Sequence, residues 1–75
     1  MRFDKELDVR DARCPLHVLR LRKAITQMNH GEVLRIRARD PESLKDFRKF
    51  SDQTGNRLLS VRAAGKEFVF FMRKA

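Results

Sequence analysis

The sole cysteine of the chain, Cys14, is the residue best suited to do chemistry. It follows a short strand-like run and comes directly before a helical pattern that opens with Pro15. Proline suits the first position of a helix, where its missing N–H would have no partner anyway. We therefore expect Cys14 near the helix N-cap, where unpaired N–H groups and the positive end of the helix dipole favour a thiolate. Because Arg13 adds positive charge, the sequence predicts an exposed thiol whose pKa lies below that of free cysteine.

His17 stands one helical turn after Cys14, and the sequence leaves its role open. The imidazole could hydrogen-bond the sulfur or, when protonated, stabilise its anion. Alternatively, His17 simply continues the start of the helix, since it falls between the apolar stripe and the exposed face. One cysteine and two histidines, His17 and His30, make a poor set of metal ligands. We therefore expect no metal and no cofactor.

Six short elements must position these residues, because the hydrophobic period changes from two to 3.6 and back along the chain. Alternation predicts strands, apolar residues three and four apart predict helices, and the turn residues Gly55, Asn56 and Gly65 separate the later elements. Asp40 and Pro41 read as the N-cap and first turn of the second helix, and Gly31 as the end of the first. The predicted elements are strand 3–9, helix 15–29, strand 33–39, helix 41–54, strand 58–63 and strand 67–73.

The order βαβαββ predicts an α/β (α+β) two-layer sandwich, with a four-stranded mixed sheet and two helices on one face. The helices should bury one stripe each, and the strands alternate side chains. The expected core of the helices is Val18, Leu21, Ala24, Ile25, Met28 and Phe47, and Leu44 and Ser51 lie on the same helical face as Phe47. The expected core of the strands is Leu34, Ile36, Ala38, Leu59, Val61, Phe68 and Phe70, and in the first strand Phe3, Lys5, Leu7 and Val9 share one face.

The composition fits one small domain spanning residues 1–75. A lone cysteine, with no apolar run of transmembrane length and no signal peptide, favours a reducing cytoplasmic location and no membrane contact. The formal net charge of +8 implies attraction to something acidic, either RNA or an acidic protein surface, or else only solubility. We expect the protein to be a monomer.

Two surfaces are candidates for partner docking. Leu16 and Leu19 point away from the apolar stripe close to Cys14, on the same side of the helix as Arg20 and Lys23. The alternating arginines of strand 33–39 should project together from the solvated face of the sheet. These arginines could contact phosphate, dock an acidic protein, or be an ordinary polar strand face. They are Arg35, Arg37 and Arg39.

An ordered set of landmarks resembles the TusA/SirA family of small sulfur-carrier proteins, from about Leu7 to Lys74. The landmarks are Leu7-Asp8, Cys14-Pro15, Arg22-Lys23, Gly31-Glu32 and Asp40-Pro41. The family motif is Cys-Pro-x-Pro, whereas this chain has Cys-Pro-Leu-His, with His17 in place of the second proline. Physically, Asp8 reads as a residue that fixes the loop before Cys14.

The resemblance implies the same two-layer sandwich and a sulfur carrier that holds persulfide sulfur on Cys14. It also implies a cysteine desulfurase or another sulfur donor, and an acceptor in a relay toward tRNA thiolation, cofactor synthesis or sulfur metabolism. The chain shows no evident acid–base set, so whether it acts as an enzyme stays open. Two alternatives remain, in which Cys14 is incidental: a basic nucleic-acid-binding module and a regulatory adaptor.

Overall fold

The computed structural model describes residues 2–75, and its elements follow the predicted order. The first strand begins at Lys5 rather than Phe3, and the first helix ends at Thr26 rather than near Asn29, so Gly31 does not end that helix. Gly31 instead lies in the turn before the next strand, with φ at 83°. The elements are β1 (Lys5–Asp8), α1 (Leu16–Thr26), β2 (Val33–Ala38), α2 (Ser43–Thr54), β3 (Arg57–Ala64) and β4 (Glu67–Arg73).

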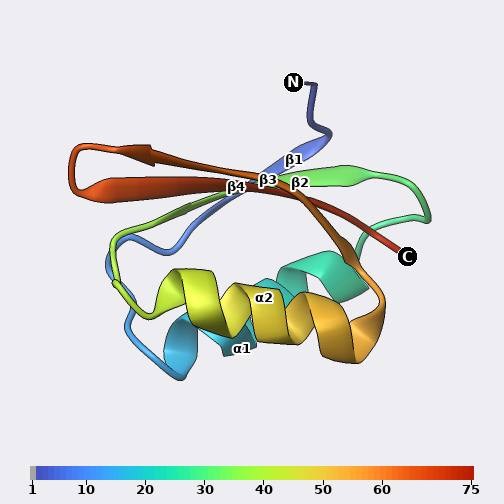
Figure 1. Cartoon of the computed structure of the whole chain (residues 1–75). Coiled ribbons are helices and arrows are strands. Elements are labelled where there is room, and N and C mark those ends of the chain that lie inside the picture. Colours follow the sequence, from blue (N-terminus) through green and yellow to red (C-terminus); the bar gives the residue numbers. More distant parts are fainter. Residues whose placement is uncertain (1) are drawn as a thin grey trace.

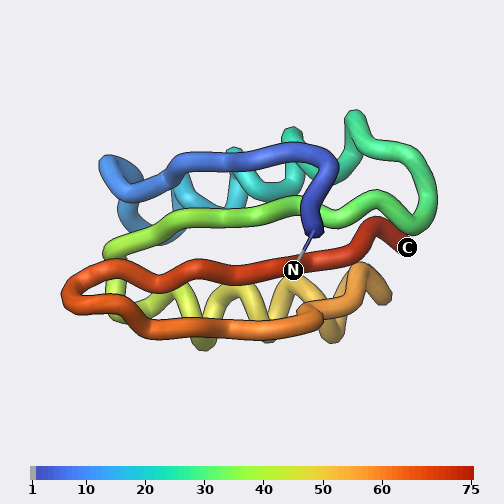
Figure 2. The backbone as a smooth tube through the Cα atoms, turned by 90° about the horizontal axis from the view of Figure 1, so that it is seen from above, coloured from blue at the N-terminus to red at the C-terminus, as the bar shows by residue number. Residues whose placement is uncertain are grey.

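The strands form one mixed sheet in the order β1-β2-β4-β3, which confirms the predicted sandwich. β1 pairs with β2 in parallel, and the other two pairings are antiparallel. A parallel pair needs a crossover connection, and α1 provides it. Both helices lie beneath the same face of the sheet (Figure 1), and the view from above shows the strand order directly (Figure 2). No helix within residues 2–75 has the length and apolar character needed to cross a bilayer.

The core fills the space between the two layers and confirms most of the predicted stripes. Leu34, Ile36 and Ala38 alternate inward from β2, because every second strand residue faces the same side. Leu21 and Ile25 meet them from α1, and the ring of Phe47 from α2 packs edge-on against that of Phe70 at 4.8 Å. Of the residues on the predicted apolar faces, six are only partly buried at its margin: Leu7, Val18, Ala24, Leu44, Val61 and Phe68.

One core prediction, Leu59, is wrong, and two residues that share a face with core residues, Phe3 and Ser51, also lie outside the core. The register of β3 shifts between Leu58 and Ser60, so Leu58 rather than Leu59 packs on the core, since a bulge interrupts the alternation. Phe3 precedes β1 and stays 45% exposed, with its ring 6.2 Å from that of Phe71. In α2 the buried residues are Ser43, Phe47 and Phe50, whereas Ser51 is half-buried.

The start of α2 also differs from the prediction. Asp40 lies two residues before the N-cap position, which is Glu42, and the regular helix begins at Ser43. The Asp40 carboxylate nevertheless accepts the backbone N–H of Glu42 at 2.9 Å, so it closes the turn that leads into the helix. Gly55 ends α2 as predicted, with φ at 79°, a conformation that glycine adopts without steric cost.

Candidate functional site

Cys14 is exposed in the turn immediately before α1. The helix begins at Leu16 with Pro15 at the N-cap, one residue later than the sequence predicts, and the Cys14–Pro15 peptide is cis. The backbone N–H of Cys14 donates to Oδ2 of Asp40 at 3.0 Å. Because the same carboxylate accepts the N–H of Glu42, Asp40 joins the starts of both helices. These two hydrogen bonds lower the pKa of Asp40.

The electrostatic environment of the thiol contradicts the prediction of a lowered pKa. The pKa of Cys14 is raised, first by the short-range interaction of its thiol with the Asp46 carboxylate, then by partial desolvation and by the charges of Asp46, Asp40 and Glu42. A nearby negative charge disfavours a second anion, and here three carboxylates outweigh the helix N-terminus and Arg13. The thiolate is therefore scarcer at neutral pH than in free cysteine.

His17 lies behind the thiol, inside the protein. Its side chain is fully buried, and its ring packs at 5.1 Å from that of Phe47. Nε2 lies 3.2 Å from Oδ2 of Asp46, close enough for an ion pair, but the two atoms do not have hydrogen-bond geometry. Both ring nitrogens and this Oδ2 lack a hydrogen-bond partner among residues 2–75. The sulfur of Cys14, a nitrogen of His17 and an oxygen of Asp46 lie within 4.8 Å of one another.

Sequence reasoning missed Asp46, although a signal for it exists. Ser43, Asp46, Phe47 and Phe50 have the spacing that puts residues on one side of a helix. Ser43, Phe47 and Phe50 are buried, and the Asp46 side chain is only 19% exposed. An acidic residue on the inner stripe of a short helix is unusual, because burying a charge is costly unless it has a partner. That position points Asp46 at a polar partner across the helix pair.

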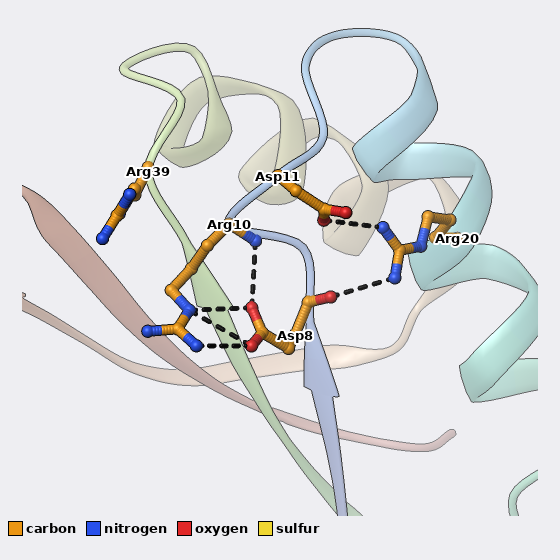
Figure 3. A pocket seen from close by; sticks show the side chains of 5 residues that line it. All are labelled: Asp8, Arg10, Asp11, Arg20 and Arg39. Carbon is orange, nitrogen blue, oxygen red and sulfur yellow. Dashed lines mark hydrogen bonds and ion pairs between the residues drawn. The ribbon is translucent and has the colours of Figure 1, made fainter.

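The docking candidates on α1 have different environments. Leu16 and Leu19 are 52% and 57% exposed, as predicted, and Lys23 is exposed on the same helix. Arg20 is instead held in place: its guanidinium donates to the carboxylate of Asp11 and to the backbone carbonyl of Asp8, both at 3.0 Å. These contacts tie α1 to the loop before Cys14, as Figure 3 shows.

Asp8 supports that same loop and makes no hydrogen bond or ion pair with Cys14 within the described part of the chain. Its carboxylate accepts both the guanidinium and the backbone N–H of Arg10. The guanidinium of Arg10 therefore holds the pKa of Asp8 well below its usual range. Together with Asp11, Arg20 and Arg39, these two residues line the polar hollow drawn in Figure 3.

The arginines of β2 lie on the sheet face opposite the helices, so the structure does not bring them to the thiol. Arg35 is ion-paired with Glu6, and Arg37 donates to Glu67 at 3.0 Å. Both side chains are 28% exposed. Arg39 at the strand end is exposed. The open face is thus less basic than the arginine spacing alone suggests.

Comparison with known proteins identifies the family of the chain. The family model described as Sulfurtransferase TusA matches residues 5–74. The Sulfur carrier protein TusA of Allochromatium vinosum is 44% identical over 73 residues, which cover 97% of this chain and 96% of that protein. The putative sulfur carrier protein YrkI of Bacillus subtilis is 30% identical over 99% of both chains.

A solved structure shares the fold. The crystal structure of a SirA-like protein from Desulfitobacterium hafniense superposes with a TM-score of 0.81, over 93% of this chain and 96% of that one, at 17% identity. Likeness at that identity concerns the architecture alone, whereas the family match and the relatives concern the sequence. The chain belongs to the TusA family of sulfurtransferases and sulfur carriers.

Proposed function

We propose that the domain of residues 1–75 carries sulfur as a persulfide on Cys14. The observation that supports this most directly is the exposure of the sole cysteine in the turn between two anchored segments. Its backbone is held by Asp40 on one side, and the loop before it by Arg20 on the other. A fixed, exposed sulfur at a helix start suits transfer between proteins, since donor and acceptor must both reach it.

The transfer is a thiol–disulfide type exchange without net oxidation. The Cys14 thiolate attacks the outer sulfur of a donor persulfide, and a new bond forms from Sγ to that sulfur. The S–S bond of the donor breaks, and the donor thiolate leaves and takes up the proton that Cys14 released. Because the pKa of Cys14 is raised, the donor complex must remove that proton or shield the nearby carboxylates.

A sulfur carrier of this family requires a donor and an acceptor. We propose a cysteine desulfurase or a related persulfide enzyme as the donor, and an acceptor in a cytoplasmic relay such as tRNA thiolation. The exposed Leu16 and Leu19 would be the contacts beside the thiol on which the partner docks. We propose that this chain acts as a monomer. The alternative of RNA binding through the sheet has less support, since Arg35 and Arg37 are ion-paired with Glu6 and Glu67.

Sulfur loading tests the proposal. The reduced protein is incubated with a cysteine desulfurase and cysteine, and intact mass is measured before and after treatment with a reductant. We expect one added sulfur atom on the wild type, lost on reduction, and none on Cys14→Ser. Thermal unfolding of that variant should match the wild type, because the side chain is exposed. Loading of the serine variant, or no loading of the wild type, would contradict the proposal.

A further inference from the structure

Three potential metal ligands converge where α2 packs against the start of α1; the sequence places Cys14 and His17 close together, but not Asp46. Cys14 comes from the turn before α1, His17 from its first turn, and Asp46 from α2. Their sulfur, nitrogen and oxygen atoms all lie within 4.8 Å of one another. We expected no metal from the sequence because we considered only the one cysteine and the two histidines as ligands, and not Asp46.

The buried part of this cluster contains polar atoms that have no hydrogen-bond partner among residues 2–75. His17 is 0% exposed, and neither of its nitrogens has a hydrogen-bond partner within residues 2–75. The facing Oδ2 of Asp46 is likewise unpartnered in that range. A buried polar atom without a partner is costly, and the large majority of buried side-chain polar atoms in proteins have one. An imidazole nitrogen that lies close to a carboxylate and a thiol has the chemistry of a metal ligand.

We propose that Cys14, His17 and Asp46 form a Zn²⁺ site. Thiolate, imidazole and carboxylate are the three side-chain ligand types that zinc uses. Three protein ligands with one open position is the arrangement of an accessible site, and the exposure of Cys14 leaves that fourth position to water.

The geometry and charge suit a small divalent cation. Tetrahedral ligands at the usual Zn–S, Zn–N and Zn–O lengths lie roughly 3.3 to 3.6 Å apart, so the cluster must contract by about 1 Å. The exposed Cys14 side chain can supply that movement, while His17 stays fixed against Phe47. Asp46, Asp40 and Glu42 make this spot locally acidic. Binding displaces the thiol proton to solvent, and the thiolate and carboxylate charges then neutralise the ion.

Zinc and transferable sulfur would compete for one sulfur atom. A Cys14 thiolate bound to zinc cannot also attack a donor persulfide, so the metal-loaded chain should not accept sulfur. This consequence rests on the proposed carrier function, whereas the zinc site itself does not. Zinc release would then be a precondition of sulfur loading.

Metal titration of the full chain tests the site. The protein is stripped with a chelator, kept reduced, and titrated with Zn²⁺ by calorimetry and with Co²⁺ by absorption spectroscopy. We expect one ion per chain, with the visible bands of tetrahedral Co²⁺ and a sulfur-to-metal charge-transfer band. Cys14→Ser should lose the charge-transfer band. Asp46→Asn and His17→Gln should each weaken binding by at least the roughly 10- to 100-fold that losing a partner of a metal ligand costs.

Two matched controls isolate the site. Asp52→Asn removes an exposed carboxylate from the same helix, and His30→Gln removes the other histidine; both should bind metal like the wild type. Because His17 is buried, His17→Gln could fail to fold. In that case the metal affinity of Asp46→Asn tests the site. Unchanged affinity in Asp46→Asn, or absence of binding to the wild type, would overturn the site. Sulfur loading of the metal-free wild type, measured separately, tells failure of the carrier function apart from failure of the zinc site.

Discussion

The reactivity of Cys14 depends on two opposing electrostatic effects at its sulfur. The start of α1 and the nearby Arg13 favour the thiolate, whereas Asp46 and Asp40 favour the neutral thiol. The carboxylates prevail, and Asp46 contributes most to raising the pKa of the thiol. An exposed cysteine that is mostly protonated is protected from adventitious oxidation, because oxidation follows thiolate character. Its reactivity is then available mainly when a partner alters this environment.

This account predicts that Asp46→Asn lowers the pKa of Cys14. The amide removes the negative charge that disfavours the thiolate, so alkylation by iodoacetamide at neutral pH should become faster. The pH dependence of the alkylation rate should shift to lower pH in Asp46→Asn. In the wild type, the rate should rise at a higher pH than it does for free cysteine. Rates are followed by mass spectrometry in metal-free buffer, with Asp52→Asn as the charge-matched control. Equal profiles for Asp46→Asn and the wild type would show that Asp46 does not control the thiol.

Among the elements, those with one buried face were readable from the sequence. β2 alternates cleanly because one side of it meets the helices, so its bounds were predicted closely. β4 is apolar from Phe68 to Met72 without alternation, and its predicted start came from the turn at Gly65. The bulge that turns Leu58 inward left no such pattern, because it breaks the period. The candidate site was readable only in part. Cys14 can be identified from its position at a strand-to-helix junction. Its proximity to Asp46 cannot, because it depends on how α1 and α2 pack.

Asp40 connects the starts of α1 and α2 through its two backbone hydrogen bonds, so its removal should lower the stability of the fold. Asp40→Ala removes the acceptor of the Cys14 and Glu42 N–H groups and should cost about 1 kcal/mol, as loss of a helix cap does. The pKa of Asp40 is lowered in the folded state, so its contribution is present above the ordinary carboxyl pKa and lost as pH falls through the folded pKa. The cost should therefore be present at neutral pH and shrink under acid conditions.

Urea unfolding of wild type and Asp40→Ala at neutral and acid pH measures this difference. Glu42→Ala is a suitable control, since it removes a neighbouring exposed carboxylate without removing either acceptor. A stability difference that did not depend on pH would argue that Asp40 acts through packing and not through its charge.

For the whole molecule, the distribution of charge matters more than its sum. The formal net charge of +8 would suggest a basic sheet, yet two central arginines there are neutralised by Glu6 and Glu67. The helix layer instead combines exposed Leu16 and Leu19 with Lys23 near the start and middle of α1, the helix that begins beside Cys14. Apolar contacts with a basic margin suit docking of an acidic donor surface.

The two faces can be told apart by reversing one charge on each. Lys23→Glu alters α1, and Arg62→Glu alters the exposed open face of β3; each lowers the net charge of +8 by two. If the donor docks on α1, Lys23→Glu should slow sulfur loading and flatten its dependence on ionic strength, because steering acts mainly on the association rate. Arg62→Glu should load nearly as the wild type does. The measurement is the initial rate of sulfur transfer from desulfurase at several salt concentrations. Equal slowing by both variants would mean that only net charge steers the partner, and slowing by Arg62→Glu alone would move the docking surface to the sheet.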